Sequence, residues 1–388
     1  MISSSKRLTL GALAAGVLAL STGAAWAQDV VKIGYSGPLS GGAALYGKDI
    51  LDGMRMAVAE INAAAPEIGG KKYRFEVVGL DDKYNPSETA INAQRLTQEH
   101  KTPVILVGHS GGIYATQTTN EAQKYLILAY SSAPKITQNN NKLTVRIPPA
   151  FTDYMPTFVR YAMDKHGKTL GVALADHDYA KAWNENLKVA WVAAGGKIVA
   201  ENPMSYNRAT DFYSGVSRVM AAKPDVMLIG GPSEPTGLVV KQARELGFKG
   251  GFMMIDQAKM EDVSKISGGY ASLEGAVGTM PLVDWGTKST DDFVARFKAF
   301  NPSRGANSEH GLAYTAVFAT LEAMKLAKTT TDAVAIRAQF DAAFKKMTPA
   351  NNPYAFNGVD AAGAALVVPP VAVVENGKVR AYTIPAGK

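Results

Sequence analysis

The chain has 388 residues, of which 47% are hydrophobic and 19% are charged, and it is too long for one ordinary hydrophobic core. Its net charge of +7 comes from scattered Lys and Arg residues, which does not indicate a nucleic-acid-binding protein. The absence of cysteine excludes disulfides, thiolate metal sites and a cysteine nucleophile. The five histidines show no metal-ligand spacing, so no metal or other cofactor is expected.

The first 27 residues have the three parts of a secretory signal. Lys6 and Arg7 supply the positive start, Leu8–Leu20 is an apolar stretch, and Ala25–Ala27 is a cleavage site of mainly small residues. A membrane-spanning helix needs about 20 apolar residues, more than this stretch contains. The sequence therefore predicts export, cleavage after Ala27 and a periplasmic location.

Short continuous runs rich in Val, Ile and Leu alternate with amphipathic segments along the rest of the chain. Such runs are typical of strands buried on both faces of a parallel sheet, with helices between them. The predicted strands are Val31–Tyr35, Phe75–Leu80, Val104–Gly108, Leu126–Tyr130, Leu170–Ala175, Val226–Gly230 and Gly251–Ile255. Among the helices, Ser87 is expected to cap one that extends to Arg95. The predicted fold class is α/β, with doubly wound, Rossmann-like sheets.

The strand–helix units form two groups, which predicts two lobes. The segments Arg146–Pro149 and Gly278–Pro281 are expected to cross between them. Two or three helices (within 290–300, 310–327 and 331–347) and a hairpin of Val371–Glu375 and Arg380–Ile384 are expected beyond the second crossing. The predicted N-terminal lobe comprises residues 28–147 and about 279–350, and the predicted C-terminal lobe comprises residues 148–278 and about 351–388.

Ligands of open parallel sheets bind beyond the carboxyl ends of the strands. Small polar segments follow six of the predicted strands: Ser36–Pro38, His109–Gly112, Ser131–Ala133, Asp176–Tyr179, Gly231–Ser233 and Asp256–Gln257. Free N–H groups at a helix N-terminus suit a carboxylate, Asp256 can oppose a ligand cation, and Tyr46 and Tyr179 can form a flat wall. Each segment also fits a simple helix cap or turn. Six of them together indicate a ligand site.

The segment Gly42–Lys48 fits the nucleotide-binding pattern G-x-x-x-x-G-K, with a predicted strand before it and a helix after it. The next position holds Asp49, where a hydroxyl should bind Mg²⁺. A carboxylate there would face the phosphates, and no nucleotide supply is expected outside the cytoplasm. A small solute is therefore the favoured ligand of this loop.

The segment Gly108–Gly112 is a literal G-x-S-x-G that follows a predicted strand, as the nucleophile of an α/β-hydrolase does. An acid, Asp256 or Asp284, and then His310 follow in the order that such enzymes use. Against this interpretation, no oxyanion segment is present, and His310 begins a helical pattern. A secreted serine hydrolase using Ser110 remains the alternative of another class.

Several segments together are similar to the type I periplasmic solute-binding proteins of ABC importers, in the branched-chain amino acid (Leu/Ile/Val-binding) class. The segments are Ile33–Gly41 with Tyr46 and Gly47, Gly53–Asn62, Asp81 and Asp82 with Pro86, Val107–His109, Ser131–Pro134 with Ile136 and Thr137, Asp178 and Tyr179, Pro224–Val226, Gly230 and Gly231, and Gln242–Gly247. They cover nearly the whole mature chain in the family's order and spacing.

The resemblance implies two Rossmann-like lobes joined by three crossings, a non-catalytic trap for a small amino acid, and a membrane permease as partner. The implied first-lobe contacts are Ser110, Gly111 and Gly112 for the carboxylate, Ser131, Ser132 and Ala133 in the next loop, and Tyr46 against the ligand's side chain. In the second lobe, Tyr179 and Ser233 match contact positions, and Asp256 matches the acid that meets the ammonium. A monomer that binds no nucleic acid is expected.

The sequence departs from the family pattern at three positions of the implied site. Pro134 stands where a Thr hydroxyl usually helps to hold the ammonium, Gly112 stands where Ser is frequent, and Ser233 follows Pro232 where Tyr is frequent. A carboxylate site beside Tyr46, Tyr114 and Tyr179 would also suit an aromatic acid. An aromatic carboxylate is therefore kept as the alternative ligand.

Overall fold

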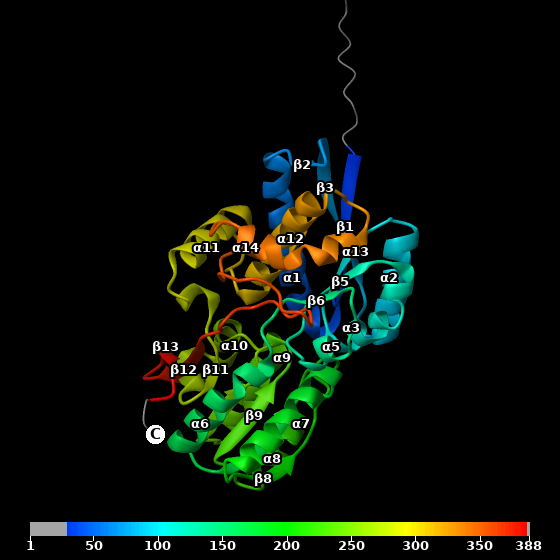
Figure 1. Cartoon of the computed structure of the whole chain (residues 1–388). Helices are drawn as coiled ribbons and strands as arrows, with labels where there is room; N and C mark the ends of the chain where they lie inside the picture. Colours follow the sequence, from blue (N-terminus) through cyan, green and yellow to red (C-terminus); the bar gives the residue numbers. More distant parts are fainter. Residues whose placement is uncertain (1–28, 386–388) are drawn as a thin grey trace, which may run out of the picture.

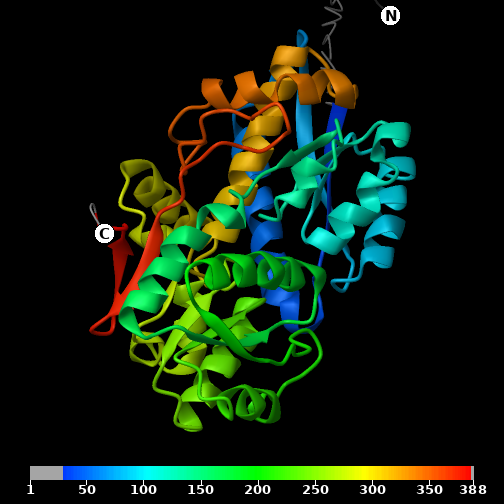
Figure 2. The ribbon, with the colours of Figure 1, turned by 60° about the horizontal axis from the view of Figure 1, so that its bottom comes forward.

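The structure is a computed structural model that describes residues 29–385, so the predicted export signal lies outside the described residues. These residues form two lobes, each built on one mainly parallel sheet covered by helices (Figure 1). The predicted α/β class with two doubly wound lobes is confirmed. In Figure 2 most of the N-terminal lobe, in blue, cyan and orange, lies above the green segments of the C-terminal lobe, and the red terminal hairpin lies at the left.

The sheet of the N-terminal lobe has the strand order β2-β3-β1-β4-β5-β6, and all its pairs except β2–β3 are parallel. Its strands are β1 (Asp29–Gly37), β2 (Glu67–Ile68), β3 (Lys71–Asp81), β4 (Val104–Val107), β5 (Leu126–Ala129) and β6 (Thr144–Arg146). The apolar runs of β4 and β5 are buried along their whole length, as expected for strands covered on both faces.

The sheet of the C-terminal lobe has the order β13-β12-β11-β10-β9-β7-β8. Its strands are β7 (Thr169–Leu174), β8 (Lys197–Glu201), β9 (Val226–Gly230), β10 (Gly251–Met254), β11 (Val277–Thr279), β12 (Val371–Glu375) and β13 (Lys378–Tyr382). The last two are antiparallel and turn at Asn376 and Gly377, which confirms the expected hairpin. The hairpin pairs with β11, so the chain ends on this lobe.

The helices differ from expectation at two places. They are α1 (Ala44–Ala63), α2 (Pro86–Gln98), α3 (Ser110–Gln117), α4 (Asn120–Gln123), α5 (Lys135–Gln138), α6 (Met155–Lys165), α7 (Asp178–Ala193), α8 (Tyr213–Met220), α9 (Ser233–Glu245), α10 (Met260–Ser267), α11 (Lys288–Phe300), α12 (Ser308–Ala327), α13 (Ala333–Ala338) and α14 (Phe340–Lys346). The cap of α2 is Asn85, whose side chain accepts from Ser87 N at 2.8 Å, and Pro86 occupies the first turn. Gln339 divides the expected single helix 331–347 into α13 and α14.

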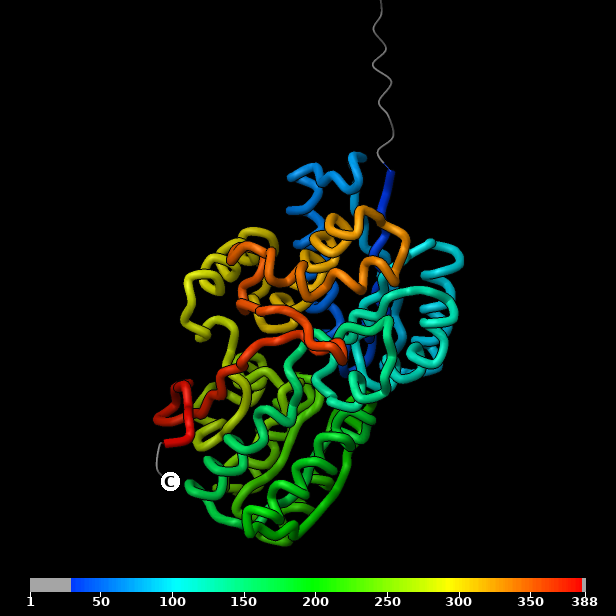
Figure 3. Tube along the Cα trace, in the orientation of Figure 1, coloured from blue at the N-terminus to red at the C-terminus, as the bar shows by residue number. Residues whose placement is uncertain are grey.

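The chain crosses between the lobes three times. Two crossings follow β6 and β11, close to the expected positions. The third lies nearer to residues 366–370 than to 350, because Tyr354, Phe356 and Val359 pack into the N-terminal core instead of the C-terminal one. Figure 3 traces this last crossing in orange and red towards the terminal hairpin.

Helix α12 carries side chains of its first turn to the boundary between the lobes. It packs along α1, where a Cβ added at Gly53 would lie 2.3 Å from the carbonyl oxygen of His310. Only a glycine permits that backbone approach. The close packing sets the position of Ser308 and Glu309, which both line the cavity described next.

Candidate functional site

A cavity lies between the lobes and contains about 710 Å³ of space not filled by atoms, its open mouth included. Its walls come from both lobes and from all three crossings. The lining residues are Tyr46, Tyr84, His109, Ser110, Tyr130, Ser131, Ser132, Pro148, Pro149, Tyr154, Tyr179, Asp256, Gln257, Lys259, Thr279, Met280, Trp285, Ser308, Glu309, Leu312, Tyr354, Val367, Pro369 and Pro370. A pocket that is mostly apolar and aromatic, with a few convergent polar groups, is typical of a small-molecule site.

The cavity brings together about half of the predicted site residues. Tyr46, Ser110, Ser131, Ser132, Tyr179 and Asp256 line it, whereas Gly111, Gly112, Tyr114, Ala133 and Ser233 do not. The two glycines allow neighbouring side chains to pack closely against the start of α3. A Cβ at Gly111 would lie 2.8 Å from Pro86 Cγ, and a Cβ at Gly112 would lie 2.5 Å from Thr89 Oγ1.

The other predicted residues that are outside the cavity have local roles. Ser233 lines a smaller adjoining cavity, and its hydroxyl accepts from Lys259 N at 3.0 Å. The Tyr114 ring lies under the Lys135 ammonium, 5.5 Å from it. Ala133 is completely buried, and its N–H donates to the Ser131 hydroxyl at 3.3 Å.

The N-terminal lobe presents hydroxyls and a helix N-terminus to the cavity. Ser110 begins α3, and its hydroxyl lies 2.6 Å from that of Ser131, which follows β5. Within residues 29–385, the backbone N–H groups of Ser110, Gly111 and Ser132 have no hydrogen-bond acceptor. Unpaired N–H groups and the positive end of a helix favour an anion here.

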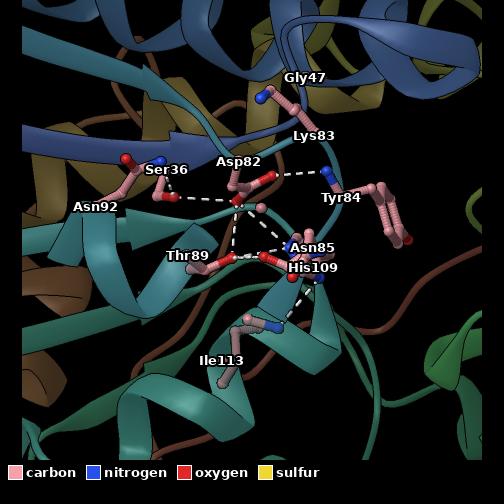
Figure 4. A network of polar contacts seen from close by, with 12 residues as sticks. Ser36, Gly47, Asp82, Lys83, Tyr84, Asn85, Thr89, Asn92, His109 and Ile113 are labelled. Atoms are coloured by element: carbon pink, nitrogen blue, oxygen red, sulfur yellow. Dashed lines mark hydrogen bonds and ion pairs between the residues drawn. The ribbon is translucent and has the colours of Figure 1, made fainter. Parts of the chain in front are cut away.

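A buried polar network holds this helix start in place (Figure 4). The His109 side chain caps α3, because its Nδ1 accepts from Gly112 N at 3.1 Å. Since Nδ1 accepts, the ring proton is on Nε2, which lies 3.1 Å from Thr89 Oγ1 and 3.3 Å from Asp82 Oδ2. Asp82 Oδ2 also accepts from Ser36 Oγ at 3.0 Å. Two segments that are distant in sequence, Ser36 of β1 and the stretch from Asp82 to Thr89, therefore orient the residue that precedes Ser110.

The C-terminal lobe presents one carboxylate to the cavity. Asp256 follows β10, and its Oδ1 accepts from Trp183 Nε1 at 2.8 Å and from the Tyr179 hydroxyl. In the described part of the chain, Oδ2 of Asp256 accepts no hydrogen bond, so it is available to a ligand. The Tyr179 hydroxyl also lies 2.7 Å from Ser132 Oγ, which joins the two lobes across the site.

A buried ion pair forms another part of the cavity wall. Lys259 precedes α10 of the C-terminal lobe, and its Nζ lies 3.2 Å from Glu309 Oε1 of α12 in the N-terminal lobe. Burial raises the pKa of Glu309 to about 7, although Lys259 acts in the opposite direction. Burial alone would lower the pKa of Lys259, but Glu309 and Asp256 raise it above its ordinary value. Lys259 is therefore charged inside the cavity.

Sequence reasoning missed most of the aromatic wall and this ion pair. The missed lining residues with large or charged side chains are Tyr84, Tyr130, Tyr154, Lys259, Trp285, Glu309 and Tyr354. None of them lies in the six segments at the strand ends: Glu309 is in the first turn of α12, and Trp285 and Tyr354 lie in loops. The position of Lys259 just after Asp256 was a signal that could have been used.

The residues of the hydrolase hypothesis are not assembled. The side-chain partner of the Ser110 hydroxyl is Ser131, and His310 is not among the residues that line the cavity. The His310 ring packs on Phe297 with ring centroids 4.0 Å apart, and its Nδ1 accepts from Asn307 N at 3.1 Å. Ser110 therefore has no base in the arrangement that the hypothesis requires.

The nucleotide-like loop also has a structural explanation. Asp49 is buried in α1, forms an ion pair with Arg304 and accepts from Asn307 Nδ2 at 2.7 Å. Asn307 Nδ2 also donates to Asp262 of α10 at 3.0 Å. Asp49, whose carboxylate makes a Mg²⁺–nucleotide site unfavourable, thus contributes through Asn307 to a contact between the lobes.

A stack of three rings crosses the boundary between the lobes. The Tyr84 ring lies between His109 of its own lobe and His177 of the other lobe, at centroid distances of 4.5 and 4.9 Å. The His177 ring is only partly buried as a whole, but its Nε2 is buried and has no hydrogen-bond partner among the described residues. Burial, and then the nearby His109, lower the pKa of His177 to about 3.

This stack predicts a specific pH effect of His177→Asn. Asparagine can still cap α7, as the His177 Nδ1 does by accepting from Ala180 N. Because the pKa of His177 is lower in the folded protein than in the unfolded chain, protonation at low pH favours the unfolded protein. Relative to the variant, the wild type should therefore lose about 1–2 kcal/mol of unfolding free energy between pH 7.5 and 5.

Urea unfolding of both proteins at the two pH values measures this difference. Glu309, which has a raised pKa, acts with the opposite sign in both proteins, so its effect cancels in the comparison. An equal loss in wild type and variant would show that His177 is not the titrating group.

Among residues 29–385, no helix combines the length and apolarity that a membrane span requires. A family model described as "Periplasmic binding protein" matches residues 30–377 of the chain. The Leu/Ile/Val-binding protein of Escherichia coli is 30% identical over 278 residues, which cover 70% of this chain and 72% of that protein. A leucine-, isoleucine-, valine-, threonine- and alanine-binding protein of Pseudomonas aeruginosa is 25% identical over 279 residues, 71% of this chain and 73% of that protein.

Solved structures share the fold at lower identity. The branched-chain amino acid transporter substrate-binding protein LivJ of Streptococcus pneumoniae, in complex with isoleucine, has a TM-score of 0.76 and 21% identity. The match covers 92% of this chain and 99% of that one. The leucine-binding protein LivK of Thermotoga maritima also has a TM-score of 0.76, with 23% identity over 91% of this chain and 98% of that one.

Proposed function

Since the chain belongs to the periplasmic binding protein family, we propose that it is the substrate-binding protein of an ABC importer and captures a small α-amino acid, branched-chain or related. The relatives named above bind Leu, Ile and Val, which supports this class of ligand. The observation that carries the proposal is the unpaired Oδ2 of Asp256 in the same cavity as the unpaired N–H groups at the start of α3.

In this proposal the two ends of the amino acid group bind different lobes. The ammonium binds Asp256 Oδ2, and the carboxylate binds near Ser110, Ser131 and Ser132. A ligand can shift the lobes towards closure only if it binds the closed form more tightly, and contacts with both lobes supply that difference. Tyr46 lies against the ligand's side chain.

An aromatic carboxylate is the second candidate ligand. The lining contains Tyr46, Tyr130, Tyr154, Tyr354 and Trp285, which suit an aromatic ring. This candidate leaves Asp256 without a cation, so we place it after the amino acid. The partner in both cases is the membrane permease of the importer, and the location is the periplasm, reached by the export signal that ends at Ala27.

Thermal unfolding of the mature protein with a panel of ligands tests the proposal. The panel contains the twenty α-amino acids, their deaminated analogues and simple aromatic acids such as benzoate. At one hundred times Kd, a ligand that binds only the folded state adds about 2.7 kcal/mol to the unfolding free energy, which raises the midpoint by several degrees. A panel in which no α-amino acid moves the midpoint would contradict the proposal, and a shift by benzoate alone would support the aromatic alternative.

A further inference from the structure

The cavity contains a second set of buried polar groups besides those assigned to the amino acid group. Glu309 is 2% exposed, and its Oε2 has no partner among the described residues, while Oε1 meets Lys259 at 3.2 Å. Gln257 is 6% exposed; its amide nitrogen donates to the Tyr84 hydroxyl at 2.9 Å, and its Oε1 has no partner in that part of the chain. Both side chains line the cavity.

Buried polar atoms normally have hydrogen-bond partners, and leaving one unpaired destabilises the protein. The unpaired atoms of Glu309 and Gln257 are all acceptors. Lys259 contacts both Glu309 and the carbonyl oxygen of Asp256, so its ammonium is already engaged. The acceptors of Glu309 and Gln257 therefore lack donors among the described residues, and a ligand can supply them.

The charges that line the cavity support the same conclusion. They are the carboxylate of Asp256, the ammonium of Lys259 and the carboxyl group of Glu309, whose pKa burial raises to about 7, so above that pH the wall carries one more acidic than basic group. The α-ammonium of an amino acid pairs with Asp256, and the α-carboxylate of the same ligand balances the positive charge of that ammonium. A further hydrogen-bond donor on the ligand's side chain would pair with the remaining acceptors of Glu309 and Gln257.

We propose that Glu309 and Gln257, with Lys259 orienting Glu309, bind an N–H-donating group on the ligand's side chain, so that the preferred ligand is a polar amino acid. This inference rests on the proposed function, because it assumes that the α-amino group binds Asp256. It distinguishes the cavity from one that takes purely aliphatic side chains. Glu309 and Gln257 are specificity-determining residues, and Lys259 is a positioning residue.

Calorimetric titration with two near-isosteric pairs of amino acids tests the inference. Asparagine and glutamine carry an amide where leucine and methionine carry apolar groups of similar shape. We expect the wild type to bind the better amide at least about tenfold more tightly than its apolar counterpart, the effect of a hydrogen bond to a charged group. Tighter binding of leucine and methionine would overturn the inference while leaving the proposed function intact.

Two variants test whether the preference for an amide side chain depends on the ion pair of Lys259 and Glu309. Glu309→Gln should lower the amide-to-apolar affinity ratio by about tenfold, because the charge that strengthens the bond is lost. Combining Lys259→Met with Glu309→Leu replaces the pair by apolar side chains of similar volume, which buried sites tolerate, and should reverse the preference towards leucine. The control is Glu322→Gln in the same helix, outside the cavity lining, which should leave the ratio unchanged.

The amide-to-apolar affinity ratio compares two ligands on the same protein. A modest loss of stability in a variant affects both affinities equally and does not change this ratio. A wild-type preference for amides that both variants retain would overturn the assignment to Glu309. Binding of no α-amino acid at all would overturn the proposed function, and the inference with it.

Discussion

Replacing Asp82 by alanine is expected to lower the free energy of unfolding by about 3–5 kcal/mol, the effect of removing one partner from a buried charged network. The carboxylate is completely buried. It accepts from Ser36 Oγ, Thr89 Oγ1 and Tyr84 N, each at 3.0 Å, and lies 3.3 Å from His109 Nε2. The substitution leaves these donors without their acceptor in a place that water does not reach.

The same substitution should weaken ligand binding, although Asp82 does not line the cavity. Asp82 orients His109, the cap of α3, and Ser110 is the first residue of that helix. Equilibrium unfolding in urea measures the stability, and calorimetric titration measures the binding. The control is Glu99→Ala at the end of α2, an exposed carboxylate 3.9 Å from Arg95, which should change stability by less than about 0.5 kcal/mol. Equal losses in the two variants would contradict the role assigned to the network.

Asp256→Asn is expected to weaken amino acid binding by about 1.5–3 kcal/mol, roughly tenfold to more than a hundredfold in Kd. The variant keeps the shape of the side chain and an oxygen that can accept from Trp183 and Tyr179. It loses the negative charge that faces the α-ammonium. The effect should therefore appear in the affinity for ligands that carry an ammonium and not in the fold.

A deaminated analogue makes this prediction specific. The affinity for 4-methylpentanoate, which is leucine without its amino group, should not fall in the Asp256→Asn variant. The protein control is Asp176→Asn, an exposed acid at the end of β7 in the same lobe and outside the cavity lining. If the variant bound amino acids as tightly as the wild type, the ligand's ammonium would not meet Asp256, and the aromatic carboxylate would become the leading candidate.

The internal strands were predictable because their signal is local. Runs such as Val104–Val107 and Val226–Gly230 are apolar throughout and buried on both faces. The strands that were missed lie at sheet edges or pair over few residues: β8 is only partly buried, and β6 has three residues. Edge strands carry mixed composition because one side faces solvent, so their sequence pattern is weaker.

The candidate site was predictable only where a strand end placed a side chain. Ser110, Ser131 and Asp256 line the cavity because the carboxyl ends of parallel strands meet at one edge of a sheet. Gly112 and Tyr114, further along α3, turn away from the cavity as the helix rotates. The residue directly after a strand is therefore predicted to line the site more reliably than residues further along the following helix.

The sequence alone determined the alternation of strands and helices, the two lobes and the strand ends that line the cavity between them. It did so because apolar runs, helical periodicity and polar strand ends are properties of neighbouring residues. Only the tertiary structure decided that Glu309, at the start of α12, faces Lys259 of the other lobe, and that Tyr84 lies between two histidines. Those contacts depend on how α12 packs against Gly53 and on how the two lobes lie against each other, and no local pattern in the sequence records either.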